Sequence, residues 1–125
     1  MYELEISRLK EYQERLRELR KCLNVEGAKA QIASIEHQMA AAGFWDDPDT
    51  AQKALQKMKA LKSSIGAPDD LHKELDDALA FAELAREEAD ESLAAEILGH
   101  TDTLEERLKH LELNSLFTDP RDAKN

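Results

Sequence analysis

Apolar side chains recur three and four residues apart along most of this chain, the spacing that places them on one face of a helix. From Tyr2, the first predicted helix has the stripe Leu9, Tyr12, Leu16, Leu19 and Leu23. Asn24 can end this helix and cap the next one, whose first turn Gly27 weakens. The second predicted helix runs to about Ala42, with Ala28, Ile32, Ile35 and Met39 facing the core. We therefore expect a tight helix-turn-helix or a kink at Asn24.

Two further helical stripes come after residues 43–48. The first of them has Leu55, Met58, Leu61 and Ile65 inward and Lys53, Lys57, Lys59 and Lys62 outward. Residues 63–68 contain two serines, Gly66 and Pro68, which predict the end of that helix and the start of another. The stripe of the next helix consists of Leu71, Leu75, Ala78, Ala82, Ala85 and Ala89. Its small residues allow a neighbouring helix to approach closely, while Leu79, Phe81 and Leu84 broaden the apolar face.

The acidic run of residues 87–92 predicts the tip of a helical hairpin, with Asp90 or Ser92 capping the last helix. That last predicted helix has Leu93, Ile97, Leu104, Leu108 and Leu111 on one side. Residues 99–102 begin with glycine and predict a kink or a break in this helix. We assign residues 1–117 to the helical bundle and the polar residues 118–125, which have no apolar period, to a linker.

The stretch Gly43-Phe44-Trp45-Asp46-Asp47-Pro48 separates the second and third predicted helices. Gly43 can end one helix with a positive φ, and Asp46 or Asp47 can cap the next, with Pro48 at its first position. We interpret the two aromatic rings as a core anchor that covers the end of the core, in preference to a ligand-stacking role. The cluster of aspartates lacks the spacing of a calcium loop, so capping is the favoured role.

Composition supports an all-α protein. The chain is 42% hydrophobic and 35% charged, and its Leu, Ala, Glu and Lys content favours helices over strands. We expect an elongated antiparallel bundle, or helical hairpins, of four to five helices. Apolar runs are too short to cross a membrane and the N-terminus is charged, so we expect no membrane partner and a cytoplasmic location. The single cysteine, Cys22, excludes an internal disulfide.

Charge is distributed unevenly. The net charge is −10, of which residues 67–125 contribute −11, residues 43–66 contribute +1 and residues 1–42 contribute 0. The acidic half is therefore not expected to bind nucleic acid. Arg15, Arg17, Arg20 and Lys21 form a dense basic cluster, for which capping and solvation are favoured over a phosphate or protein docking site. Any RNA contact is expected through this cluster or through the lysines of the third predicted helix.

The sequence contains none of the common catalytic motifs. The sequence has no glycine-rich phosphate loop and no Ser/His/Asp set in a nucleophile context, and its four histidines are scattered. Paired acids such as Asp76-Asp77 are more simply explained as a solvated helix face. We therefore assign no catalytic, cofactor-binding or metal-binding residue and expect no enzymatic activity from this chain alone.

The order of these features resembles the N-terminal domain of the bacterial peptide chain release factor 2 family. The resemblance rests on three segments: residues 19–24, the turn Phe44-Trp45-Asp46-Asp47-Pro48, and residues 116–125 with Asp119-Pro120. It covers essentially the whole chain, and the Trp turn favours type 2 over type 1. In that family the stop-codon-reading tripeptide and the Gly-Gly-Gln motif lie beyond this domain, and neither occurs here.

The resemblance implies a cytoplasmic domain that takes part in translation termination without being catalytic. Its implied partners are the factor-binding region of the ribosome near the stalk base and the remaining release factor domains. The alternatives are a free-standing acidic helical adaptor or coiled-coil protein, and a ribosome-rescue paralogue. Self-association of the chain through the heptad stripe beginning at Leu71 is a further expectation.

Overall fold

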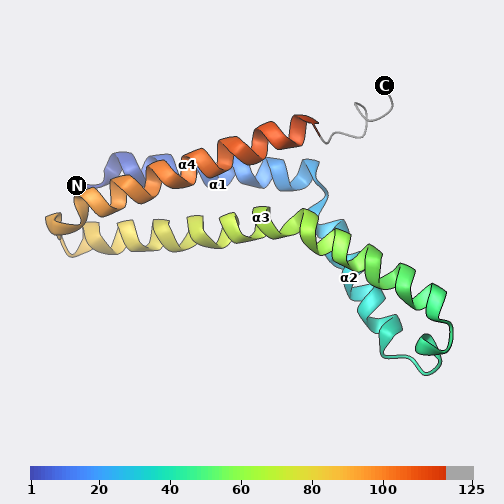
Figure 1. The fold of residues 1–125 in the computed structure, drawn as a ribbon. Coiled ribbons are helices and arrows are strands. Elements are labelled where there is room, and N and C mark those ends of the chain that lie inside the picture. The colour runs from blue at the N-terminus through green and yellow to red at the C-terminus, as the bar shows by residue number, and fades with distance from the viewer. Residues whose placement is uncertain (118–125) are drawn as a thin grey trace. The chain divides into compact units, whose positions relative to one another are not determined.

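The structure is a computed structural model that describes residues 1–117 (Figure 1). Its α-helices are α1 (Glu3–Cys22), α2 (Val25–Met39), α3 (Pro48–Glu87) and α4 (Ala94–Phe117). Two short 3-10 helices, η1 (Phe44–Asp46) and η2 (Glu91–Leu93), lie in the connections. No strand occurs among the described residues, which confirms the all-α prediction. The predicted linker at 118–125 lies outside the described residues.

The chain divides into two compact units. Unit 1 comprises residues 1–19 together with the chain from Pro68 onward, and unit 2 comprises residues 20–67. Unit 2 is therefore a continuous segment inserted in the sequence of unit 1. Among the described residues, no helix is long and apolar enough to span a membrane.

Unit 1 is a bundle of α1, the second part of α3, and α4 (Figure 1). Side-chain contacts show the relative directions of the helices. Arg8 contacts Asp102 and Arg15 contacts Glu112, so α1 and α4 run parallel. Tyr2 contacts Asp90, just beyond the end of α3, and Gln13 contacts Asp76, so α1 and α3 run antiparallel. The predicted stripes form the core. Its most deeply buried large residues are Leu9, Tyr12, Leu16, Leu71, Leu75, Leu104 and Leu108. Each leucine contributes about 1.5–3 kcal/mol by leaving water, so this core dominates the stability of the unit.

The connection from α3 to α4 is a tight turn held by hydrogen bonds of Asp90. Ala89 has a left-handed backbone with φ 52°, and the Asp90 carboxylate accepts hydrogen bonds from the Ser92 backbone N–H at 2.9 Å and its hydroxyl at 2.6 Å. Asp90 therefore caps η2, the short 3-10 helix that leads into α4, and does not cap α4 directly as predicted. The buried Tyr2 donates its hydroxyl hydrogen to the Asp90 carbonyl, which attaches the start of the chain to this turn.

Unit 2 contains α2 and the first part of α3 as an antiparallel hairpin (Figure 1). Its buried cluster is small, consisting of Val25, Ala28, Ile32 and Ile65, with Leu23, Met58 and Leu61 packed against it. Asn24 has a left-handed backbone, with φ 54°, and its side-chain oxygen accepts a hydrogen bond from the Gly27 N–H at 3.3 Å. The predicted tight connection and its Asn cap are therefore confirmed.

The predicted helix end at residues 63–68 is wrong, because α3 continues through Pro68. Proline removes one backbone donor, which leaves the Ser64 carbonyl without its partner four residues on and costs about 3 kcal/mol in a helix interior. Pro68 is itself buried, and the buried residues Ile65 and Leu71 lie three positions before and after it. The apolar burial of these side chains offsets the lost hydrogen bond.

The predicted kink or break at residues 99–102 is also wrong, because α4 is continuous there. Thr101 is 1% exposed, and its hydroxyl donates to the Ile97 carbonyl at 2.7 Å, so this polar side chain is satisfied inside the helix.

The C-terminal end of α2 comes earlier than predicted, because the helix ends at Met39 and not at about Ala42. Gly43 does have a positive φ of 89°, but it lies in the turn after the helix.

Candidate functional site

Side chains that could bind a metal ion or react with a substrate are dispersed over the two units. Among residues 1–117, no group of three or more His, Cys, Asp and Glu side chains is placed to hold a metal ion. His100 and His110 are exposed, and His72 lies 3.6 Å from Asp76 one helical turn away. Cys22 is exposed. Charged surfaces and grooves occur in both units.

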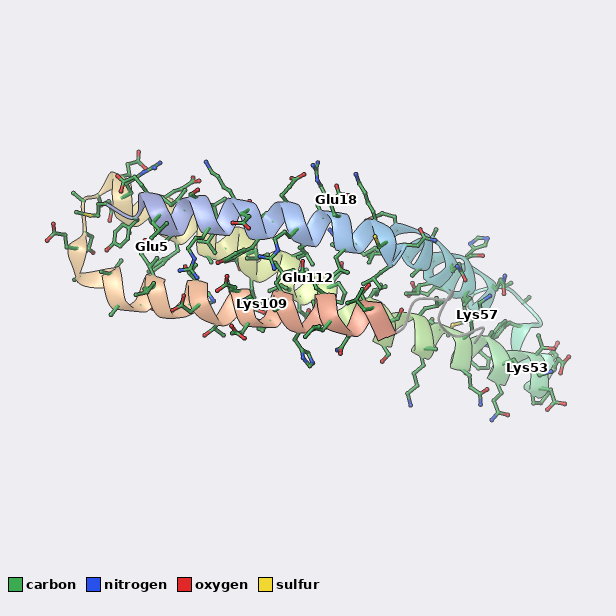
Figure 2. The ribbon with its side chains drawn as sticks, turned by 90° about the horizontal axis from the view of Figure 1, so that it is seen from above. Glu5, Glu18, Lys53, Lys57, Lys109 and Glu112 are labelled. Carbon is green, nitrogen blue, oxygen red and sulfur yellow. The ribbon has the colours of Figure 1, made fainter. Side chains whose placement is uncertain are left out.

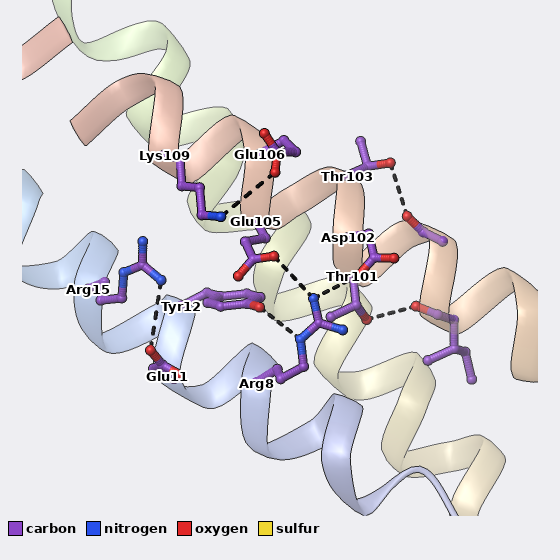
Figure 3. A network of polar contacts seen from close by, with 12 residues as sticks. Arg8, Glu11, Tyr12, Arg15, Thr101, Asp102, Thr103, Glu105, Glu106 and Lys109 are labelled. Carbon is purple, nitrogen blue, oxygen red and sulfur yellow. Dashed lines mark hydrogen bonds and ion pairs between the residues drawn. The ribbon is translucent and has the colours of Figure 1, made fainter. Parts of the chain in front are cut away.

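A polar network joins α1 to α4 in unit 1 (Figure 3). Arg8 donates to the Tyr12 hydroxyl at 2.8 Å, to Asp102 at 2.7 Å and to Glu105 at 3.3 Å. The hydrogen bond to Asp102 raises the pKa of the Arg8 guanidinium, and burial raises the pKa of the Tyr12 hydroxyl. Arg8 is held as a permanent cation by fixed partners, so it serves to join the two helices.

The basic cluster predicted on α1 is not a single anion site. Arg15 forms a bidentate pair with Glu112, with nitrogen-oxygen distances of 2.6 and 3.2 Å, and this hydrogen bond raises the pKa of Arg15. Its guanidinium also lies 5.6 Å from the Tyr12 ring centroid. Arg17 pairs with Glu14. Arg15 is thus committed to packing within unit 1 and is not available to an external phosphate.

Unit 2 presents a second set of cations on α3, whose members Lys53 and Lys57 are marked in Figure 2. The exposed lysines are Lys53, Lys57, Lys59 and Lys62. No carboxylate within residues 1–117 forms an ion pair with any of these four, in contrast to Arg8 and Arg15. Their charge is therefore available to an external anion.

A polar groove runs beside Lys57, between α2 and α3 of unit 2. It has a volume of about 210 Å³ and is lined by Gln31, Ser34, Ile35, Gln38, Ala54 and Lys57. This groove was not predicted from the sequence. The signal was present, because Gln31, Ser34 and Gln38 repeat at three and four residues as a polar stripe on α2.

Trp45 is not the core anchor that the sequence predicted. Its side chain is 56% exposed, and it contacts Phe44 edge to face with ring centroids 4.8 Å apart. The core of unit 2 lies mainly at residues 23–32 and 58–65, away from this turn. The residues just before the turn, Ala40–Ala42, have small side chains, and Phe44 contacts the indole edge to face while more than half of Trp45 stays exposed. Asp47 does cap α3, because its carboxylate accepts from the Thr50 backbone N–H at 3.4 Å and also from the Thr50 hydroxyl at 2.8 Å.

The two units differ in charge. Unit 2 carries seven Lys/Arg and five Asp/Glu, a net charge of +2. The described part of unit 1 carries eight Lys/Arg and 20 Asp/Glu, a net charge of −12. The acidic character of the second half of the sequence therefore belongs to unit 1, and the net charge of unit 2 is the one that favours an anionic partner.

Comparison with known proteins identifies relatives over nearly the full length of the chain. The PCRF domain matches residues 28–125. The chain is 36% identical over 117 residues to peptide chain release factor 2 of Staphylococcus epidermidis, an alignment covering 94% of this chain and 32% of that protein. Proteins of the same name from Acidothermus cellulolyticus and Clostridium perfringens are each 31% identical, over 93% and 98% of this chain and 31% and 34% of theirs. The chain thus spans about a third of the length of the curated relatives it matches.

Proposed function

Because this chain belongs to the PCRF domain family, we propose that it is the N-terminal domain of a class I peptide chain release factor of type 2. In this proposal the domain takes part in stop-codon-dependent termination in the cytoplasm. It helps the factor to bind the ribosome at the factor-binding region near the stalk base, beside the remaining release factor domains. Residues 118–125 link it to the next domain.

The observation that carries the ribosome-binding role is the exposed lysine face of unit 2. Ribosomal RNA presents a dense array of phosphates, which lysines bind as point charges with release of counterions. Lys53, Lys57, Lys59 and Lys62 are exposed without an ion pair to any described carboxylate. Gln31 and Gln38 in the adjacent groove add amide groups that can hydrogen-bond to phosphate or sugar.

Ester hydrolysis is assigned to other parts of the factor. The Gly-Gly-Gln tripeptide on which that chemistry depends in the resembling family does not occur in this sequence. Release requires a group positioned against the reacting ester and a second element held in the decoding site, and such positioning supplies most of the rate. We therefore propose that this chain binds without catalysing release, even at large excess over ribosomes.

The test compares a double charge reversal on each unit. The 125-residue chain and its Lys53→Glu/Lys57→Glu variant are titrated against stop-programmed ribosomes at several salt concentrations. Losing two phosphate contacts should weaken binding and lower the slope of log affinity against log salt by about 2. The matched control, Lys73→Glu/Lys109→Glu, makes the same charge change at residues of unit 1 and should leave that slope unchanged.

The possible outcomes distinguish an error about the lysine face of unit 2 from an error about ribosome binding itself. An equal loss in both double variants would show that net charge matters and that the lysine face does not. Absence of binding by the parent chain would contradict the ribosome-binding role itself. Stop-codon-dependent peptide release by the parent chain would contradict the assignment of catalysis to other domains.

A further inference from the structure

An unfilled groove lies between α3 and α4 in unit 1. It has a volume of about 330 Å³, with Ala78 and Ile97 in its floor, Phe81 at its wall, and Asp77, Glu96 and His100 at its rim. We propose that this groove docks the apolar face of a cationic amphipathic helix from another protein. The proposal concerns a different surface from the lysine face of unit 2 and stands independently of it.

The floor and wall supply the apolar part of the site. Ala78 and Ile97 are 6% and 3% exposed and close the bottom of the groove, while Phe81 is 39% exposed, which is unusual for a large aromatic side chain. The volume is at the lower end of the range for binding pockets. It has room for the anchor side chains of a helix, the mode in which apolar residues at i, i+3 or i+4 and i+7 enter a groove.

The rim determines the charge of the occupant. Asp77 and Glu96 flank the groove, and the nearby Arg107 is neutralised by its ion pair with Glu74. Unit 1 as a whole carries −12 over its described residues. Such a field repels RNA and repels a second copy of unit 1, whereas it attracts lysine and arginine side chains. A cationic partner is therefore the complementary one.

The same two helices already bind a helix of this kind on their other flank. There α1 presents the buried residues Leu9, Tyr12 and Leu16. Arg8 and Arg15 lie beside Tyr12 (Figure 3). Those arginines pair with three acids of α4, namely Asp102, Glu105 and Glu112. The groove at Phe81 repeats this composition, an apolar floor between acidic residues, on the side of α3 and α4 that α1 leaves uncovered. Its occupant is expected to resemble α1 in having an apolar stripe flanked by arginine.

The test uses a synthetic 18-residue helical probe with leucines at i, i+3, i+4 and i+7 spacing and arginine elsewhere. A second peptide keeps the leucines and replaces every arginine by glutamate. Each is titrated into the full 125-residue chain while backbone amide chemical shifts and affinity are measured. We expect the arginine peptide to shift amides of residues 74–84 and 94–103 and the glutamate peptide to bind at least tenfold more weakly.

Variants of the chain separate docking from general attraction of charge. Phe81→Ser, at a partly exposed position, should weaken the arginine peptide about tenfold, and so should Asp77→Lys/Glu96→Lys. The controls Leu113→Ala and Glu88→Lys change an exposed leucine and an exposed acid outside the groove and should change affinity by less than twofold. Shifts spread evenly over unit 1, equal effects in the controls, displacement of α1, or dimerisation through Phe81 would each overturn the proposal.

Discussion

Gly27 is constrained by its neighbour in the turn between α1 and α2. A Cβ at this position would lie 2.7 Å from the Asn24 Cγ and Oδ1, which is too close for the capping side chain to stay in place. At Gly99, by contrast, a Cβ would meet nothing within 4 Å. Glycine at position 27 weakens the first turn of α2, but only glycine leaves room there for the Asn24 side chain that caps this helix.

Alanine substitutions at these two glycines should have opposite effects. Gly99→Ala should raise the free energy of unfolding by about 1 kcal/mol, the usual gain of alanine over glycine in a helix. Gly27→Ala should lower it by up to about 1 kcal/mol, because losing the Asn24 cap costs up to about 2 kcal/mol and offsets that gain. Urea unfolding followed by circular dichroism measures both. Stabilisation by Gly27→Ala would contradict the role of the cap.

Trp45 should contribute little to stability, because more than half of its side chain remains in water. Trp45→Ala is expected to change the free energy of unfolding by less than about 1 kcal/mol, whereas a fully buried Trp would cost about 3–5 kcal/mol. The measurement is the midpoint of urea unfolding. A loss of 3 kcal/mol or more would show that the indole is covered in solution.

At the scale of the element, two of the caps, Asp47 and Asp90, are charged groups whose effect depends on pH. Hydrogen bonds from the Ser92 side chain and backbone lower the pKa of the Asp90 carboxylate from its usual 3.8. A carboxylate with a lowered folded-state pKa stabilises the fold above the unfolded pKa, and this stabilisation is lost as pH falls through the folded pKa. The same direction holds for Asp47, because Thr50 donates to it.

Asp90→Asn should therefore differ from the parent in a pH-dependent way. The asparagine keeps an oxygen that can cap but carries no charge. The difference in unfolding free energy between parent and variant should be constant near neutral pH and should shrink below about pH 4. Thermal unfolding at a series of pH values measures it. Curves that stay parallel down to pH 2 would show that the Asp90 charge does not contribute.

Helix length was the property of the elements that the sequence predicted least well. The stripes of α1 and α4 and the caps at Asn24 and Asp47 depend on neighbours within one or two turns, and all were predicted. Pro68 was interpreted from local propensity as a stop, yet burial on either side of it carries α3 onward. Propensity is a weak prior where tertiary contacts decide.

At the scale of the whole molecule, the contacts that sequence could not predict are those between distant segments. Arg8 and Asp102 are separated by 94 residues, and the tyrosine at position 2 reaches a carbonyl 88 residues away. No periodicity identifies such partners. The outward position of Trp45 and the groove at Phe81 have the same origin, because each depends on which helix face the rest of the chain leaves uncovered.

The two units should differ in local stability. Unit 2 has a small buried cluster around Val25 and Ile32, whereas unit 1 has seven large side chains that are at most 2% exposed. Amide hydrogen exchange should therefore be faster in α2 than in the centre of α4, because local opening depends on the amount of buried apolar contact. Equal protection of both helices, measured by mass spectrometry, would indicate a single cooperative unit.

The insertion of unit 2 into the sequence of unit 1 also orders events during synthesis. The hairpin of residues 20–67 is complete once its own residues have left the exit tunnel. The leucines of α1 must wait for α4, which ends at Phe117. At about 5–20 residues per second, that delay is on the order of 5–20 s. During this interval the apolar stripe of α1 is uncovered, which makes the nascent chain a substrate for chaperones. The stripe is covered only when α4, the last helix to be synthesised, packs against it.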